Sequence, residues 1–382
     1  GGGKVGPILL ISNGHGEDIL ASELAKQLAL EHEVVALPLV GEGTAYDRAG
    51  IKKIHSQPLL PSGGFAYLGV KNLSRDVSAG LFAQLKEQKA ALKGLRGVKL
   101  AVCVGDTYNL FFTSRYLKCK KVFVPTAKSN YIKAHSFLDL LIMRKNALVV
   151  FPRDEITAKD LRKRKVRAHY LGNLMMDALH PQGIHFGIDR FIGILPGTRD
   201  DAVINLKAIL EVVSLLETCN SFLVAMNDDG GGKSLLNDGW VEDQDPPHFA
   251  YRVLKKGEKK VYLCRDLFAD IIAKAELVIG LSGTGNEQAA GLGKPVVTFV
   301  GPGAQFTPYF ARKQKKLLGD AVLFVGEGKS PKEIAEAVDR LYSDPELCRR
   351  MGQEGRKRMG APGAARKMAE LILAILKGEV VF

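Results

Sequence analysis

The chain has 382 residues and contains few of the features that would indicate a metal, a disulfide scaffold or a membrane span. Its five cysteines are scattered and include no Cys-x-x-Cys pair, which argues against a disulfide framework or a zinc knuckle and fits a reducing cytoplasm. The eight histidines lack metal-ligand spacing. No apolar run reaches the ~18–20 residues that a spanning helix needs. We also find no repeat of ~20–50 residues, which excludes a solenoid.

Positive charge, by contrast, is in excess. The formal net charge of +13 favours anionic partners, namely phosphates, nucleic acid or an anionic membrane face. The basic residues recur in four short runs, at Lys159–Arg167, Lys255–Lys260, Arg312–Lys316 and Arg356–Arg358. Each run alone is typical of a solvated helix face. The chain is also too long for one typical core, which predicts two domains.

Apolar runs separated by helical stretches fill both halves of the chain. The first half is predicted to form strands at Ile8–Ser12, Val34–Leu37, Leu100–Val104, Val122–Val124 and Ala147–Phe151. The second half is predicted to form strands at Phe191–Leu195, Phe222–Ala225, Val261–Leu263, Leu277–Ile279, Val296–Phe299 and Val322–Val325. This alternation predicts parallel sheets covered by helices on both faces. The acidic, glycine-rich stretch 227–247 is expected to be a surface excursion.

We therefore predict an α/β fold of two facing, doubly wound (Rossmann-like) domains. Ligands would bind in the gap between them, at the carboxyl ends of the strands. The first domain is expected to span residues 1–183 and to be completed by the C-terminal helix 362–382, which would pack there or be exchanged within a homodimer. The second domain would span 184–361, and the segment 181–188 at the boundary would serve as the linker. The glycine-rich start, residues 1–7, is expected to be a flexible leader, and the first apolar run a strand rather than a signal peptide.

A glycine-rich turn after the strand Leu277–Ile279 is the most informative segment. Backbone N–H groups at the start of a helix are unpaired and carry partial positive charge, so they hold phosphate well. Glu287, one turn inside the helix, is placed to accept hydrogen bonds from sugar hydroxyls. These parts suit a nucleotide-sugar diphosphate, although an ordinary strand-to-helix turn is the alternative. The candidate residues are Ser282, Gly283, Thr284, Gly285, Asn286, Glu287 and Gln288.

A second phosphate candidate follows the first strand of the second half. Gly197, Thr198 and Arg199 lie in this turn. A guanidinium binds diphosphate in a bidentate manner and stays charged, so we expect Arg199 to hold the donor. The alternative is a surface arginine at the start of a helix.

Candidate catalytic groups follow two strands of the first half. The segment 13–18 places His15, Glu17 and Asp18 among glycines that let a ligand approach the backbone. Carboxylates at a helix start are also ordinary capping groups. Asp106 follows the strand Leu100–Val104, where the alternative is a turn residue. We expect Asp106 to be the general base and His15 to be the second candidate.

An apolar, aromatic segment at Leu59–Val70 is broken by glycine and proline and is followed by Lys71. Such a loop suits a headgroup layer or a lipid chain. The candidate acceptor and membrane residues are Phe65, Tyr67, Leu68 and Lys71. A loop packed on its own domain is the alternative.

Three segments, Tyr170–Leu179, Leu195–Arg199 and Ser282–Thr284 with Glu287, resemble lipid A disaccharide synthase in order and setting. The resemblance extends from the first strand to about residue 310. It implies the GT-B fold and an inverting glycosyltransferase that needs no metal or other cofactor. It also implies peripheral attachment to the inner face of the cytoplasmic membrane. The family's donor is a UDP-linked acylated glucosamine, and its acceptor is a monosaccharide phospholipid. Its essential aspartate corresponds to Asp106, and the arginine of its Pro-Gly-Ser-Arg motif to Arg199.

The chain departs from the family pattern in places. The family's Glu-Pro-Ser-Gly-Asp loop is replaced by the segment 13–18, which is more similar to the enzyme that adds N-acetylglucosamine to lipid-linked muramyl peptide. Thr198 stands where the family has serine, and Glu287 comes one residue early. The identities of the sugar and of the lipid therefore stay open.

We expect transfer of a hexosamine from a UDP-sugar to a lipid-linked acceptor. One alternative is an isomerase of the UDP-N-acetylglucosamine 2-epimerase type, which shares the fold and needs no lipid. Another is a basic, non-enzymatic protein that binds membrane or nucleic acid. Because basic residues and aromatics do not interleave, we do not expect nucleic acid as a partner.

Overall fold

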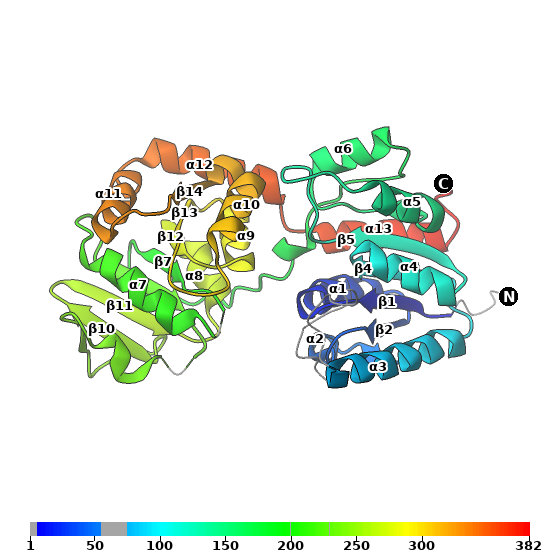
Figure 1. Ribbon diagram of the computed structural model, residues 1–382, viewed down its shortest axis with the longest axis horizontal. Coiled ribbons are helices and arrows are strands. Elements are labelled where there is room, and N and C mark those ends of the chain that lie inside the picture. Colours follow the sequence, from blue (N-terminus) through cyan, green and yellow to red (C-terminus); the bar gives the residue numbers. More distant parts are fainter. Residues whose placement is uncertain (1–5, 55–74, 199, 229) are drawn as a thin grey trace. The chain divides into compact units, whose positions relative to one another are not determined.

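A computed structural model of the protein describes residues 6–54, 75–198, 200–228 and 230–382, and only the backbone of residues 75–83. The chain divides into two compact units (Figure 1). Unit 1 comprises residues 1–178 with 362–382, and unit 2 comprises residues 179–361. The sequence prediction set the first boundary after residue 183, whereas the units divide after Ala178.

Unit 1 contains a parallel sheet with the strand order β3-β2-β1-β4-β5-β6. Its strands are β1 (Ile8–Ser12), β2 (Val34–Pro38), β3 (Lys52–Lys53), β4 (Leu100–Gly105), β5 (Lys120–Pro125) and β6 (Val149–Val150). The predicted strands of the first half are confirmed. The strand β3 was not predicted, because an edge strand of two lysines has no apolar side chains to alternate with polar ones.

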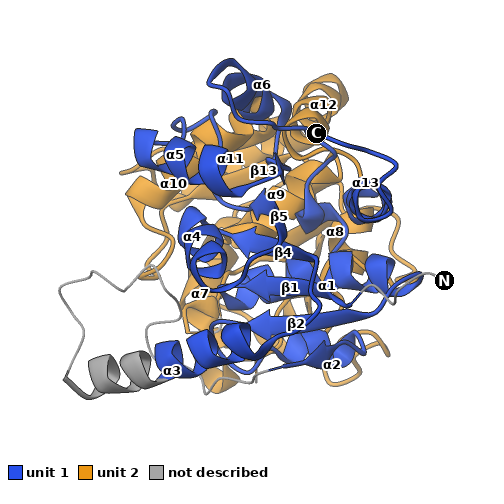
Figure 2. Ribbon diagram, turned by 90° about the vertical axis from the view of Figure 1, so that its right-hand side faces the viewer, with its two compact units in different colours: residues 1–178, 362–382 blue, residues 179–361 orange. Residues whose placement is uncertain are grey.

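Helices cover both faces of this sheet, because successive strand residues point to opposite sides. The helices of unit 1 are α1 (His15–Ala29), α2 (Thr44–Arg48), α3 (Arg75–Gly94), α4 (Thr107–Tyr116), α5 (Phe137–Asn146), α6 (Glu155–Lys163), the 3-10 turn η2 (Leu174–Met176) and α13 (Ala364–Leu376). Ile8 and Leu10 pack in one cluster with α1 and α13. Leu9 and Ile11 pack in another cluster with residues of α3 and α4. Figure 2 shows α3, α4 and α5 together on one side of the sheet.

The C-terminal segment completes unit 1. The carboxylate of Asp177 accepts hydrogen bonds from the backbone N–H groups of Gly363, at 2.7 Å, and Ala365, at 2.9 Å. The start of α13 is thereby tied to the last residues that precede unit 2. Met368 and Ile372 of α13 are buried with residues of α1. Exchange of this helix within a homodimer stays a prediction.

Unit 2 contains a sheet with the strand order β14-β13-β12-β7-β8-β11-β10-β9. Its strands are β7 (Ile192–Leu195), β8 (Ser221–Ala225), β9 (Val241–Glu242), β10 (Arg252–Lys256), β11 (Lys259–Cys264), β12 (Leu277–Gly280), β13 (Val296–Phe299) and β14 (Val322–Val325). The six strands from β14 to β11 are parallel, and β10 and β9 extend the sheet in antiparallel fashion. The expected surface excursion at 227–247 is wrong in part, because it contains β9 and buries Leu235 and Trp240.

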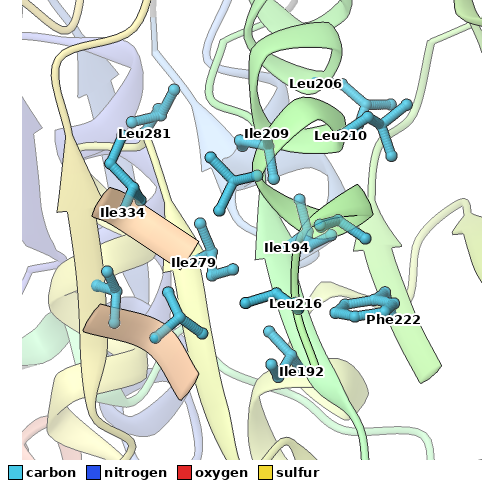
Figure 3. Packing of buried hydrophobic residues seen from close by; sticks show 14 of the residues in the cluster. Ile192, Ile194, Leu206, Ile209, Leu210, Leu216, Phe222, Ile279, Leu281 and Ile334 are labelled. Atoms are coloured by element: carbon cyan, nitrogen blue, oxygen red, sulfur yellow. The ribbon is translucent and has the colours of Figure 1, made fainter. Parts of the chain in front are cut away.

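Helices also surround the sheet of unit 2. They are α7 (Ala202–Ser214), η3 (Gly232–Leu235), α8 (Phe268–Lys274), α9 (Thr284–Gly291), α10 (Pro308–Leu318), η4 (Gly319–Ala321), α11 (Pro331–Tyr342) and α12 (Pro345–Met359). Figure 3 shows the core, in which Ile194 of β7 and Ile279 of β12 lie close to Ile209 of α7. Two doubly wound units are therefore confirmed. Among the described helices, none has both the length and the apolar character needed to cross a bilayer.

Candidate functional site

Asp106 stands at the carboxyl end of β4 and caps the start of α4. Its Oδ1 atom accepts from the backbone N–H of Asn109, at 3.1 Å, and from Nδ2 of Asn13, at 2.7 Å. The side chain is exposed, and its Oδ2 atom has no hydrogen-bond partner within the described residues. One carboxylate oxygen thus fixes the position of Asp106, while the other is available to a substrate.

Asn13 and Asn109 hold the ends of β1 and β4 in place. The side-chain amide of Asn109 donates to the carbonyl oxygens of Ile11, at 2.9 Å, and Val104, at 3.2 Å. Gly105 has a φ of 146°, and a Cβ atom there would lie 1.7 Å from Oδ1 of Asn13. Only glycine therefore lets Asn13 lie across the end of β4 and reach Asp106.

The turn between β1 and α1 contacts two further loops. His15 is exposed, and a Cβ atom at Gly41 would lie 2.3 Å from its Cε1 atom, so the imidazole ring packs on the loop after β2. Oε1 of Glu17 accepts from the hydroxyl of Thr126, after β5, at 3.2 Å. The structure therefore brings Asp106 and Glu17 to the same edge of the sheet, where β1, β4 and β5 end.

Asp18, a predicted catalytic residue, lies inside unit 1. Its side chain is buried, and its Oδ1 atom accepts from the hydroxyl of Ser12, which also contacts the hydroxyl of Tyr46 at 2.5 Å. Burial raises the pKa of Asp18 to about 7, although the hydrogen bond from Ser12 opposes the shift. We therefore correct its assignment, because Asp18 is buried beneath the turn and bonded to Ser12.

Replacement of Asp18 by asparagine should remove a pH-dependent part of the free energy of unfolding. The folded-state pKa of about 7, compared with the usual 3.8, corresponds to a contribution on the order of 4 kcal/mol to the free energy of unfolding. Because this pKa is raised, the contribution is fully present below about pH 4 and is lost as the pH rises through about 7. Urea unfolding followed by circular dichroism at about pH 5 and about pH 8 measures it.

The unfolding free energy of the wild-type chain, relative to the Asp18→Asn variant, should therefore be lower at the higher pH. The Glu336→Gln variant, which removes an exposed carboxylate of α11 in unit 2, serves as the control for the loss of a carboxylate. A difference between the wild-type chain and the Asp18→Asn variant that does not change with pH would contradict a protonated Asp18.

A buried cluster around Asp139 supports the loops after β4 and β5. Asp139, in the first turn of α5, accepts from the hydroxyl of Thr107 at 2.7 Å, from Nδ1 of His135 at 3.2 Å, and from Lys128. Burial alone would raise the pKa of Asp139, but these three partners hold it well below its usual range. Thr107 follows Asp106 directly, so the cluster fixes the start of α4. The cluster was hard to predict from the sequence, because the capping box from Ser136 to Asp139 is the only local pattern that marks it.

In unit 2, the side-chain amides of two buried residues hold the glycine-rich turn after β12 in place. Nδ2 of Asn286 donates to the carbonyl oxygen of Gly280, at 3.1 Å, and to Oε1 of Gln314, at 2.9 Å. Nε2 of Gln314 donates to the carbonyl oxygens of Ser282 and Gly283, both at 3.1 Å. Asn286 is wholly buried, so we correct its assignment from ligand binding to support of the turn.

The residues of this turn that a ligand can reach form a smaller set than predicted. Thr284 is exposed, and Ser282, Gly283 and Glu287 are partly exposed, whereas Gln288 and Gly285 are buried. The backbone N–H of Gly285 donates to the hydroxyl of Ser282, at 3.2 Å. In the described part of the chain, the N–H groups of Gly283 and Thr284 have no acceptor. Unpaired N–H groups at the start of α9 suit an anion.

The turn after β7 lies directly against the turn after β12. Gly197 has a φ of 100°, and a Cβ atom there would lie 2.7 Å from the carbonyl oxygen of Leu281. Asn205, buried in α7, donates to the carbonyl oxygen of Pro196 at 2.8 Å and accepts from the N–H of Gly303 at 3.1 Å. Asp201 accepts from the N–H of Gln305 at 2.9 Å. The loops after β7, β12 and β13 are therefore held together.

A pocket of about 240 Å³ opens beside Gly197. It is lined by Gly197, Ala202, Ala225, Met226, Asn227, Asp228 and Phe268. Asn227 and Asp266 fix its rim, since Nδ2 of Asn227 donates to Oδ1 of Asp266 at 3.0 Å and the N–H of Asp266 donates to Oδ1 of Asn227 at 2.9 Å. The pocket combines an apolar lining with a polar rim, at the ends of β7 and β8.

Several predicted site residues lie outside the described residues. They are Arg199 and the apolar-loop residues Phe65, Tyr67, Leu68 and Lys71. Thr198, next to Arg199, is described and lies in the turn after β7. The assignments of Arg199 and of the apolar loop therefore stay predictions.

Comparisons with known proteins agree with this architecture. No family model matches the chain. Lipid-A-disaccharide synthase of Trichlorobacter lovleyi is 27% identical over 216 residues, which are 50% of this chain and 51% of that protein. The match thus spans about half the length of this curated relative.

Solved structures match nearly the whole chain at low sequence identity. The UDP complex of Staphylococcus aureus MnaA is 14% identical, with a TM-score of 0.63 and 97% of each chain covered. MurG of Acinetobacter baumannii is 13% identical, with a TM-score of 0.62 and coverage of 96% of this chain and 99% of that one. The UDP-GlcNAc 2-epimerase of Neisseria meningitidis, bound to UDP-GlcNAc, is 16% identical, with a TM-score of 0.59 and coverage of 96% and 100%. The chain therefore has the GT-B fold, and half of it is similar in sequence to a lipid-A-disaccharide synthase.

Proposed function

We propose that the protein is an inverting glycosyltransferase that moves a hexosamine from a UDP-sugar to a lipid-linked acceptor without a metal ion. The observation that carries the proposal is the contact between the turns after β7 and β12 at Gly197 and Leu281, beside the unpaired N–H groups of Gly283 and Thr284. The sequence match to lipid-A-disaccharide synthase supports the choice of a transferase acting on a lipid-linked sugar.

Unit 2 would hold the donor. The N–H groups of Gly283 and Thr284 point to a diphosphate site, where fixed donors stabilise the charge that develops on the departing UDP. Glu287, one turn inside α9 and partly exposed, would accept from the ribose hydroxyls. The pocket of about 240 Å³ at the ends of β7 and β8 has room for the nucleobase. Arg199 would complete the diphosphate site.

Unit 1 would supply the general base. The acceptor hydroxyl would transfer its proton to Oδ2 of Asp106 while its oxygen forms a bond to the anomeric carbon of the sugar. The bond from that carbon to the diphosphate breaks at the same time, and UDP leaves with the electron pair. A positioned base of this kind contributes about 10²–10⁴-fold to the rate. His15, exposed at the start of α1, is the second candidate for the base.

The experiment that tests the function has two steps. Calorimetric titration with UDP and with UDP-N-acetylglucosamine should give saturable binding at one site. The enzyme is then incubated with the donor alone and with a lipid-linked monosaccharide, and the products are identified by mass spectrometry. A glycosylated lipid formed only with both substrates is the expected result. An epimerised sugar nucleotide formed without acceptor would replace the proposal by the isomerase, and no binding of UDP would overturn both.

Replacing Gly197 by alanine should weaken UDP binding by at least about tenfold, which corresponds to ~1.4 kcal/mol. The added Cβ atom would lie 2.7 Å from the carbonyl oxygen of Leu281 and would push the two turns apart. Gly187→Ala is the matched control, because Gly187 also has a positive φ, of 70°, but its Cβ would meet no atom within 4 Å. Equal UDP affinity in the two variants would show that the contact between the turns does not shape the site.

A further inference from the structure

The excess positive charge is concentrated in one part of unit 1 that no single basic run marks. Residues 84–146 contain thirteen lysines and arginines against three acidic residues, so this segment carries most of the net charge of +13. The segment comprises the described turns of α3, all of α4 and α5, and the strands between them. Six of these basic residues lie on three helices that are on one side of the sheet (Figure 2), namely Lys86, Lys89 and Lys93 on α3, Arg115 on α4, and Arg144 and Lys145 on α5.

The outer surfaces of α4 and α5 also expose large apolar side chains. The exposed fractions are 50% for Phe111, 68% for Phe137, 65% for Leu138 and 44% for Leu141. These residues are not needed for the core, because Leu110 and other residues of the inner helix surfaces are buried there. The two helices are neighbours in unit 1. Large apolar groups gathered on adjacent helices are typical of an interaction site.

A groove of about 370 Å³ between α3 and α4 continues this surface. It is lined by Leu85, Lys86, Lys89, Tyr108, Phe111, Phe112, Arg115 and Tyr116. The Nζ atoms of Lys89 and Lys93 lie 5.0 Å and 5.7 Å from the ring centroid of Tyr116. Lysine and arginine side chains with apolar stems beside aromatic rings are suited to the boundary between water and hydrocarbon.

The three acidic residues in the segment neutralise only a small part of this surface. Asp139 is buried and bonded to Lys128 and His135. Asp106 and Glu87 are exposed, but the basic residues of the segment far outnumber them. The lysines and arginines of the outer surface therefore present a positive field next to exposed apolar groups. That combination fits an anionic lipid layer better than nucleic acid, which offers phosphates but no apolar layer for aliphatic side chains.

We infer that the outer face of α3, α4 and α5 docks unit 1 on an anionic lipid surface, with Phe111, Phe137, Leu138 and Leu141 entering the headgroup layer. This docking face rests on the proposed function in one respect, because a lipid-linked acceptor would lie at such a surface. Phe111 lies five residues after Asp106 on the same helix, which is about 7.5 Å along its axis. Docking through α4 would therefore bring the carboxylate of Asp106 close to the headgroups.

The test uses the full chain and sedimentation with vesicles. Vesicles of phosphatidylcholine containing about one third phosphatidylglycerol should bind the protein, and pure phosphatidylcholine should bind it far less. Binding should weaken as salt is added. The paired substitution of Phe111→Ser and Leu138→Ser should lower the partition constant by at least about tenfold, because two apolar side chains no longer enter the lipid layer. Both side chains are exposed, so the fold should survive.

Matched controls come from the other unit. Ile204 and Leu215 are 50% and 46% exposed, and serine at both should leave vesicle binding unchanged. Charge reversal by Arg115→Glu should lower binding to the anionic vesicles about fivefold, whereas Lys332→Glu in unit 2 should not. UDP binding, measured in parallel, should be the same in all four variants.

The outcomes separate this inference from the proposed function. Vesicle binding that vanishes in the Phe111 and Leu138 variant supports the docking face even if the chain binds no UDP. UDP binding without vesicle binding would overturn the docking face alone. The docking face would also be overturned if the Phe111 and Leu138 substitutions left binding to vesicles, or to RNA used in place of vesicles, unchanged. Charge alone would then explain the association.

Discussion

Replacing Asp106 by asparagine should lower the turnover of sugar transfer by about 10²–10⁴-fold and leave the affinity for UDP unchanged. Asparagine is as good as aspartate at the start of a helix, and its Oδ1 atom can still accept from the N–H of Asn109 and from Asn13. The substitution therefore preserves α4 and removes only the oxygen that would take the proton. Steady-state rates with a UDP-sugar and a lipid-linked acceptor measure the effect.

The control for Asp106 is Asp47, an exposed aspartate of α2 that pairs with Lys53 at 2.8 Å. The Asp47→Asn variant should keep full turnover, since a surface ion pair contributes little. Turnover of the Asp106→Asn variant within about threefold of the wild-type rate would remove Asp106 as the base. In that case the His15→Gln variant, measured in parallel, should show the loss of turnover instead.

The substitution Asn286→Asp should have the largest effect on stability, because it exchanges a buried donor for a buried charge. The carboxylate would face the carbonyl oxygen of Gly280 and Oε1 of Gln314, to which Nδ2 of Asn286 now donates. If the amide of Gln314 turned to compensate, it would lose its bonds to the turn after β12. We expect unit 2 to be destabilised by roughly 3–5 kcal/mol, with loss of donor binding.

Trp240 provides a direct readout of this effect. It is the only tryptophan of the chain, and it is buried in the core of unit 2. Its fluorescence during urea unfolding therefore follows unit 2. Asn220, which is exposed, provides the matched substitution Asn220→Asp, for which the midpoint should stay the same. An unchanged midpoint for Asn286→Asp would mean that its amide does not hold the turn.

The strands that form the two parallel sheets could be read from the sequence because buried parallel strands are continuous apolar runs. Ile8–Ser12, Leu100–Gly105 and Leu277–Gly280 are examples, since all of their residues are buried. The strand β10 (Arg252–Lys256), which pairs with β11 and with the edge strand β9, escaped prediction because three of its five residues are basic. The predicted boundary after residue 183 lies close to the division after Ala178, although no change of composition marks that position.

The candidate site could be predicted only where its residues directly follow a strand in the sequence. Glycine-rich turns after strands indicated Gly197 and the segment from Ser282 to Thr284, and these are the positions that the fold places at strand ends. The polar groups that hold the turns were missed, because Asn205 and Gln314 act on loops far away in the sequence. A polar residue on the apolar side of a helix is the only signal that marks them.

The bonds from Asp177 to the start of α13 have a consequence for biosynthesis. Unit 2 is inserted between two parts of unit 1, so the first half of the chain leaves the ribosome without α13, which packs beside α1 in the core on one face of its sheet. The side of α1 that contacts α13 would remain uncovered until that helix is made. Unit 2 can close by itself earlier, because its residues form one continuous stretch. We therefore expect unit 2 to complete its core during translation before unit 1 does.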